Sequence, residues 1–202
     1  MAIAVDLRDY LTEDTIFITP TGSRLYGLEN EQSDYDFTIL SAGERHSFVH
    51  YQDGIDIRQV DFLTYARGLR DKPGGVFLES LYSQKKILGA QAANYLPYLN
   101  GFTPKATALQ ANMLKMAIAA VRKKPYKRVR FAIVLASRWN QWRWSGQGRY
   151  DPTLTPEERQ PIEDLATGLF ELDPDERERI LRDELFTLDE QGARALYHFR
   201  AP

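Results

Sequence analysis

The chain contains no cysteine among its 202 residues. This absence excludes a disulfide framework and a thiolate metal site, and it fits a reducing compartment. Long apolar runs are also missing, because no run approaches the roughly 18 residues that a membrane span needs. The first fourteen residues carry acids and do not begin with a basic region, so we expect no signal peptide. We therefore expect a cytoplasmic protein without membrane association.

Acidic residues are absent from residues 80–150, a segment that carries 13 Lys and Arg. The segments before and after it each carry 14 acidic residues. The formal net charge of -2 hides this segregation. Two interpretations remain open at this point: the basic segment packs between its acidic neighbours, or it faces the phosphates of a ligand or nucleic acid.

Residues 1–90 have the pattern of a mixed α/β unit. β-branched and aromatic residues predict strands over 15–20 and 35–42. A short helix is expected to begin at Gly22-Ser23, and Asp53-Gly54 between alternating runs indicates a hairpin. Further helices are expected over 61–71 and over 74–88, the latter as one helix or as a helix with a short strand.

Residues 91–202 have the pattern of a helical region. Thr103 is expected to cap a helix with Pro104 in its first turn. Helices are expected over 126–144, 156–170 and 174–186, and Thr187 with Glu190 forms a capping-box pattern for a last one. The fold class predicted for the whole chain is α+β, with a small mixed β-sheet core, flanking helices and a C-terminal helical region.

Two aspartates in the predicted strand 35–42 and just before it are candidate metal ligands. Alternation places Asp34 and Asp36 on one face, with Cα atoms about 6.5 to 7 Å apart. Two carboxylates this close repel each other unless a cation lies between them, and oxygen ligands suit Mg²⁺, with Mn²⁺ as the alternative. Asp56, in the strand after the hairpin, is the candidate third carboxylate of a two-ion site.

A glycine at a strand end, Gly22, lets the backbone approach a phosphate closely. Ser23 adds a hydroxyl, Arg24 adds a cation, and a helix that starts here directs N–H groups toward an anion. Together with the carboxylates, these residues predict a phosphoryl-transfer site for a nucleoside triphosphate.

Other aspartates have simpler explanations. Asp173 and Asp175 repeat the Asp-x-Asp spacing, but a proline lies between them and an acidic helix follows, so capping is the better interpretation. Asp61 is an alternative third carboxylate that helix capping explains better. For the first pair, the competing interpretation is a turn with solvated aspartates.

The strings "GSRLYG", "SDYDF" and "IDIRQVDF" resemble the nucleotidyltransferase superfamily that includes DNA polymerase β. The fuller string "GSRLYGLENEQSDYDF" is most similar to a group of predicted nucleotidyltransferases of bacteria and phages. "LRDKPGGVFLESLYS" and "PYKRVRFAIVLASRW" resemble later parts of that group, so the resemblance spans residues 16 to about 170. Its core motif is fairly specific, and the later helices are much less so.

The resemblance implies transfer of a nucleoside monophosphate from an NTP to an acceptor hydroxyl. Carried over, Gly22 and Ser23 would hold the triphosphate, while Asp34 and Asp36 would bind two Mg²⁺ ions. Asp56 would complete the metal site and help to deprotonate the acceptor. The chain departs from the family pattern in a later helix, where Phe131 and Val134 replace a histidine and an arginine, and this puts the substrate contacts in doubt.

The basic segment also contains all three tryptophans, Trp139, Trp142 and Trp144. Their spacing suits either stacking on nucleic-acid bases or packing in the core of an amphipathic helix. Within the basic cluster, contact with the nucleotide's phosphates is expected of Lys127 or Arg130. The histidines, His46, His50 and His198, fit no metal-ligand spacing.

Three functions follow, in order of preference. The first is a Mg²⁺-dependent nucleotidyltransferase whose acceptor is an RNA or DNA end, a protein or a small molecule. The second is a module that binds a nucleotide or nucleic acid without turnover. The third is an antitoxin-type enzyme that adds AMP to a partner protein. The sequence leaves the acceptor, the base preference and the oligomeric state open.

Overall fold

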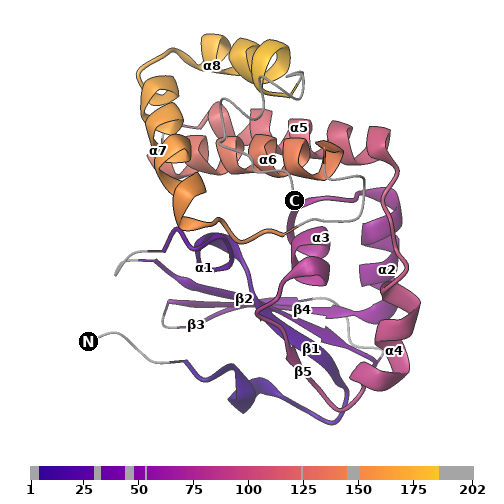
Figure 1. The fold of residues 1–202 in the computed structure, drawn as a ribbon. Helices are drawn as coiled ribbons and strands as arrows, with labels where there is room; N and C mark the ends of the chain where they lie inside the picture. The colour runs from indigo at the N-terminus through magenta and orange to yellow at the C-terminus, as the bar shows by residue number, and fades with distance from the viewer. Residues whose placement is uncertain are drawn as a thin grey trace. The chain divides into compact units, whose positions relative to one another are not determined.

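The computed structural model describes residues 5–29, 33–43, 48–52, 54–123, 125–144 and 151–186. The chain forms two compact units (Figure 1). The first comprises residues 1–104 with 151–153, and the second comprises residues 105–150 with 154–202. The sequence-based division at residue 90 falls just before helix α4 (Ala92–Leu99), which contacts strand β1 and belongs to the first unit.

A five-stranded sheet in the order β3-β4-β2-β1-β5 forms the centre of the first unit. Strands β2 and β4 pair in parallel, and the other neighbours pair antiparallel. The strands are β1 (Thr15–Pro20), β2 (Tyr35–Ser41), β3 (Phe48–Gln52), β4 (Ile55–Asp61) and β5 (Ile87–Leu88). A mixed sheet with helices confirms the predicted α+β class.

The hairpin between β3 and β4 confirms the expectation from the Asp-Gly pair. Gly54 has φ of 79°, a left-handed conformation that favours glycine, while Asp53 lies outside the described residues. The hairpin makes β3 and β4 antiparallel, and β4 then runs parallel to β2. This reversal brings residues 35–41 and 55–61 side by side.

Alternate residues of the strands supply the two faces of the sheet. On one face, Ile18, Phe37 and Ile39 form a buried cluster, covered by Tyr10 from a single 3₁₀ turn (Leu7–Tyr10). The rings of Tyr10 and Phe37 meet edge to face, with centroids 4.9 Å apart.

The other face carries helices α2 (Phe62–Asp71) and α3 (Gly75–Tyr82). Phe17 contacts Tyr65 of α2 edge to face at 5.9 Å. Thr19 donates a 2.8 Å hydrogen bond to Ser83, the residue that follows α3. The helix after β1, α1 (Gly22–Tyr26), contacts β2. Burial of both faces explains why β1 and the second half of β2 are buried along their length.

The second unit is helical, as the sequence predicts for this part of the chain. Its long helix α6 packs against α5 and α7 and is buried throughout residues 132–140. The helices are α5 (Ala106–Val121), α6 (Tyr126–Trp144), α7 (Pro156–Phe170) and α8 (Pro174–Ile180), followed by a π-helical turn (Leu181–Leu185). The bounds of α6 and α7 are those expected from the sequence.

The predicted start of α5 is wrong. Thr103 does not cap the helix, because α5 begins at Ala106 after an extended Lys105. Pro104 is buried and lies two residues before the first residue of α5, not in its first turn. The Thr187–Glu190 capping box lies outside the described residues.

Arginines of the basic segment form ion pairs with acidic residues that come later in the second unit. These pairs are Arg138–Glu158 at 2.9 Å, Arg130–Glu163 at 2.7 Å, and Arg122–Glu178. The first pair is buried, and the arginine side chain is fully inaccessible. These three arginines thus pair with acidic residues of the same unit, Arg138 in the interior and Arg122 at the surface.

No described helix combines the length and the apolar character that crossing a membrane would require.

Candidate functional site

Asp36 and Asp56 occupy directly neighbouring positions on the parallel strands β2 and β4. Neighbouring strands lie about 4.8 Å apart, and residues in register point to the same face. Thr38 pairs with Thr19 of β1, whose side chain bonds Ser83 beside α3. Asp36 lies two residues before Thr38, so both aspartates emerge on the helical face of the sheet. Each is half-buried.

Asp34 directly precedes β2 and is exposed. Asp34 lies two residues before Asp36, and residues two apart along a strand point to the same face of the sheet. Among the residues that the structure describes, no three His, Asp or Glu side chains are grouped closely enough to form a ready-made metal site. The structure thus brings two of the three predicted carboxylates, Asp36 and Asp56, to adjacent positions on neighbouring strands. Asp34 lies just before β2, near the end of the strand that carries Asp36.

Gly22 lies against the carboxylate of Asp36. A Cβ built on this glycine would be 2.4 Å from Asp36 Oδ2, which no ordinary contact allows. Gly22 also has φ of 63°, in the left-handed region. The N–H of Thr21 donates a 2.8 Å hydrogen bond to the carbonyl of Asp36. The glycine-serine motif and the aspartate motif are therefore in contact, and the left-handed backbone at Gly22 favours glycine at this position. Ser23, the next residue, is half-buried in α1.

Arg24 holds the chain that leads into β2. Its guanidinium donates hydrogen bonds to the carbonyls of Ser33 at 3.0 Å and Asp34 at 3.2 Å. It also stacks over the ring of Tyr35 at 3.6 Å. These contacts make Arg24 a positioning residue for Asp34, a role that its sequence position next to the motif did not indicate.

Two further residues support α1, and sequence reasoning missed both. Lys85 donates from Nζ to the carbonyl of Arg24 at 2.7 Å, at the C-terminal end of this helix. Glu79 of α3 accepts a hydrogen bond from Tyr26 of α1. The only sequence signal for Glu79 is its position as a single acid inside the apolar run 76–82.

Burial raises the pKa of the Glu79 carboxyl to about 7, although the hydrogen bond from Tyr26 lowers it in part. The side chain is almost inaccessible, at 4% exposure. A carboxyl that titrates near neutral pH therefore connects α3 to the helix that begins with Gly22.

The cations that were expected to contact phosphates belong to the second unit. Lys127 is exposed on α6. Arg130 is half-buried and pairs with Glu163 at 2.7 Å. Arg130 thus contacts a carboxylate of α7.

Trp139 and Trp142 are buried, at 3% and 1% exposure, and their rings stack with centroids 5.7 Å apart. Core packing is therefore the interpretation that their environment supports. Trp144, at 36%, remains exposed. Of the histidines, His50 lies on β3, while His46 and His198 lie outside the described residues.

Both predicted helix caps formed by aspartates are confirmed. Asp61 accepts a 2.9 Å hydrogen bond from the N–H of Thr64 at the start of α2. Burial acts to raise the pKa of Asp61, but the bonds from Thr64 and neighbouring backbone groups outweigh it and hold the pKa below its usual value. Asp173 accepts from the N–H groups of Asp175 and Glu176 at the start of α8.

Comparison of the chain with protein-family models and with curated proteins found no match. Any assignment of function therefore depends on the residues and contacts described above.

Proposed function

We propose that the protein is a Mg²⁺-dependent nucleotidyltransferase that moves a nucleoside monophosphate from an NTP to an acceptor hydroxyl. The observation that carries this proposal is the contact of Gly22 with Asp36, which lies in register with Asp56. A glycine that leaves its backbone open, beside adjacent carboxylates, supplies both halves of a site for a metal-bound triphosphate.

Two of the residues present suit a divalent cation, since Asp36 and Asp56 lie in register, although no three acidic or histidine side chains of the described residues are grouped for one. Two carboxylates at neighbouring positions of parallel strands destabilise the sheet through like-charge repulsion, and a cation between them would offset that cost. Asp36 and Asp56 would hold it, with Asp34 as the third ligand. When bound, Mg²⁺ neutralises charge on the phosphates and lowers the pKa of a coordinated hydroxyl.

The residues of the chain have separate tasks in the transfer. Gly22 and Ser23 bind the triphosphate through the backbone and the serine hydroxyl, and Arg24 keeps Asp34 in place through its two carbonyl contacts. Asp56 accepts the proton of the acceptor hydroxyl. The acceptor oxygen then forms a bond to the α-phosphorus, the bond to the β-phosphate bridging oxygen breaks, and pyrophosphate leaves.

The test is transfer of label from an NTP that carries it on the α-phosphate. The protein is incubated with Mg²⁺ and, in separate reactions, with tRNA, oligonucleotides, cell lysate or no added acceptor. We expect covalent label on one of these acceptors and release of pyrophosphate. Label on a lysate protein would identify the AMP-transferring variant of the activity. Absence of transfer under all of these conditions contradicts the proposal.

The variant Asp36→Ala separates a catalytic aspartate from a structural one. Metal-ligand carboxylates supply several kcal/mol of transition-state stabilisation, so transfer should fall by at least about 100-fold. Folding should be almost unaffected, because the change relieves repulsion with Asp56. The matched control is Asp173→Asn, which keeps the cap of α8 and should leave transfer unchanged. A stability loss of about 2 kcal/mol or more for Asp36→Ala, like that of a core truncation, would assign it a structural role.

A nucleotide-binding module without turnover is the second candidate. One observation favours it: in the described ranges, three acidic or histidine side chains are not grouped for metal binding. Equilibrium dialysis with labelled NTP distinguishes the two, because a binder retains intact NTP whereas a transferase converts it. For the transferase, the exposed cations Lys123, Lys127 and Arg128 of the second unit favour a nucleic-acid acceptor slightly over a protein acceptor.

A further inference from the structure

Arg58 lies on β4, two residues after Asp56. Residues two apart along a strand point to the same face of the sheet and lie about 6.5 to 7 Å apart. Arg58 also pairs in register with Thr38, the residue two positions after Asp36 on β2. The structure thus places one arginine on the same face as the two adjacent carboxylates, one step further along both strands.

The exposure of Arg58 distinguishes it from its neighbours on this face. Val60, two residues further along β4, is 2% exposed, and Thr38 is 1% exposed. Arg58 is exposed, and Asp56 is half-buried. On β4, the buried part of the helical face therefore ends before Arg58, and the part that carries Arg58 and Asp56 is accessible to a ligand.

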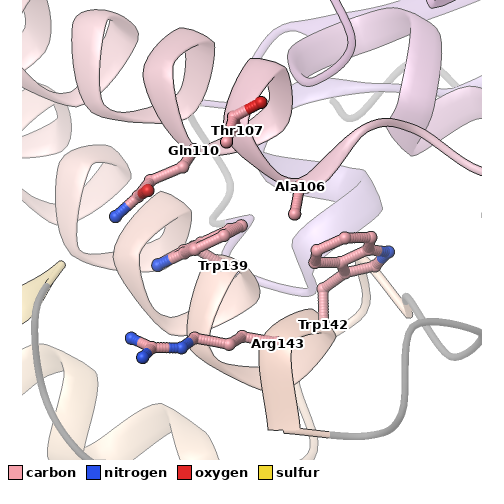
Figure 2. A pocket seen from close by; sticks show the side chains of 6 residues that line it. All are labelled: Ala106, Thr107, Gln110, Trp139, Trp142 and Arg143. Carbon is pink, nitrogen blue, oxygen red and sulfur yellow. The ribbon is translucent and has the colours of Figure 1, made fainter.

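The contacts of Arg58 give it no part in the cohesion of the sheet. Among the five strands that the structure describes, Arg58 is the only Lys or Arg, and its guanidinium forms no hydrogen bond or ion pair with the described residues. Arg143, by contrast, lines a pocket of the second unit with Trp139 and Trp142 (Figure 2). Its guanidinium stacks over the ring of Trp144 at 4.5 Å.

The order of the strands separates two sides of the proposed site. Gly22, which follows β1, lies against Asp36 of β2, and β4 lies on the other side of β2. The proposed function assigns the triphosphate to Gly22 and acceptance of the proton to Asp56. The acceptor hydroxyl therefore lies on the β4 side, near Arg58. A guanidinium in such a position suits a phosphate, which it binds through two parallel N–H groups.

We propose that Arg58 binds a phosphate of the acceptor, close to the hydroxyl that receives the nucleoside monophosphate. The acceptor is then a sugar that carries a phosphate, as at the 3′ end of a nucleic acid or in a small sugar phosphate. Arg58 selects this acceptor and takes no part in the bond changes. The inference rests on the proposed function, because the role of Asp56 is what places the acceptor beside β4.

Binding of an oligonucleotide without NTP tests Arg58 directly. A hexanucleotide with a fluorescein at its 5′ end and a free 3′ hydroxyl is titrated with the protein in Mg²⁺, and anisotropy reports binding. Arg58→Gln should lower the affinity at least about tenfold and should reduce the slope of log affinity against log salt by about 0.7. The matched control is Arg67→Gln, which removes the same charge from an exposed position of α2.

The control should leave the affinity and the salt slope almost unchanged. Equal losses for Arg58→Gln and Arg67→Gln, no loss for Arg58→Gln, or no binding by the natural protein to either kind of acceptor would each overturn the inference.

A methylphosphonate, which removes the charge of one linkage, locates the phosphate that Arg58 contacts. At the linkage nearest the 3′ end it should cost the natural protein about the same tenfold and should cost Arg58→Gln nothing further. At the linkage nearest the 5′ end it should affect both proteins alike. A further loss for Arg58→Gln at the 3′ linkage would assign that phosphate to another residue.

Competition distinguishes the two sources of the phosphate. Displacement of the oligonucleotide by ribose 5-phosphate, but not by ribose, identifies a small sugar phosphate as the acceptor. Displacement by neither assigns the 3′ end of a nucleic acid, and equal displacement by both contradicts a role for the phosphate.

Transfer of label separates failure of this inference from failure of the proposed function. In a natural protein that transfers label, Arg58→Gln should raise KM for the acceptor at least about tenfold, with kcat and KM for the NTP little changed. An unchanged KM for the acceptor overturns the inference and leaves the proposed function standing. If the natural protein transfers no label to any acceptor, the proposed function fails, and with it the assignment of the bound phosphate to an acceptor.

Discussion

The helical unit buries Arg138 against Glu158 at 2.9 Å, whereas the sheet unit sets Asp36 beside Asp56 in register. In the first case opposite charges meet, and their attraction offsets part of the cost of removing both charges from water. In the second, like charges occupy neighbouring positions, where they cost energy. Charge in the helical unit thus pairs its helices, while the carboxylates of the sheet are the residues that the proposed function assigns to a cation.

Buried ionisable groups of the two units also differ in whether their partner carries an opposite charge. Arg138 and Glu158 belong to a bonded set that also includes the start of α7, since the N–H of Thr155 donates to Glu158 at 2.8 Å. In the sheet unit, Glu79 is buried with a neutral hydroxyl as its donor, and its pKa rises to about 7. Glu79 is thus sensitive to changes of pH near neutrality.

The largest expected effect comes from breaking the buried ion pair of the helical unit. Glu158→Ala leaves Arg138 charged and enclosed, so the free energy of unfolding should fall by about 3–5 kcal/mol. Urea unfolding followed by tryptophan fluorescence measures this change in the second unit, which contains all three tryptophans.

The matched control is Glu184→Ala. Glu184 pairs with Arg179 at 3.5 Å, and both side chains are more than half exposed. Such a pair contributes about 0–1 kcal/mol. If Glu158→Ala cost no more than this control, the buried pair would not stabilise the helical unit more than an exposed pair does.

The second effect is a pH dependence specific to the sheet unit. The pKa of Glu79 is about 7 in the folded state against 4.5 as the ordinary value. Between these pH values the folded state holds a proton that the unfolded state has released. The contribution of protonated Glu79 to the free energy of unfolding is therefore fully present below pH 4.5 and is lost as the pH rises to about 7. The difference of roughly 2.5 pH units corresponds to about 3 kcal/mol.

Glu79→Gln tests this dependence, because glutamine is close in shape and does not titrate. Unfolding followed by far-UV circular dichroism at pH 4.5 and pH 7.5 should show a smaller loss of stability for the variant than for the natural protein. Parallel pH profiles for the two proteins would mean that Glu79 titrates normally.

The smallest effect compares two glycines, one from each unit. Gly22→Ala places a side chain at φ of 63° and against Asp36 Oδ2, so stability should fall by about 1–2 kcal/mol and nucleotide binding should weaken. Gly168→Ala lies inside α7 with no atom within 4 Å of the new Cβ, and should raise stability by about 0.5–1 kcal/mol. Thermal unfolding of both variants measures the difference, and changes of the same sign would contradict it.

Local chemistry was sufficient to predict many elements from the sequence. β1 at 15–20, α6 at 126–144 and α7 at 156–170 have the predicted bounds, and the hairpin at Gly54 follows from its turn residues. These features depend on periodicity, capping and turn preference within a few residues of each position. The start of α5 was mispredicted by two residues, because a Thr-Pro pair suits an extended segment as well as a helix start.

The sequence by itself determined which residue types were available for a site: aspartates at 34, 36 and 56, a glycine at 22, and a basic segment with three tryptophans. Only the tertiary structure decided that Asp36 lies opposite Asp56 and against Gly22, that Arg138 meets Glu158, and that two of the tryptophans enclose a pocket. Such contacts join residues far apart in the chain. Their formation depends on the burial of entire faces of the sheet and helices, which no local pattern specifies.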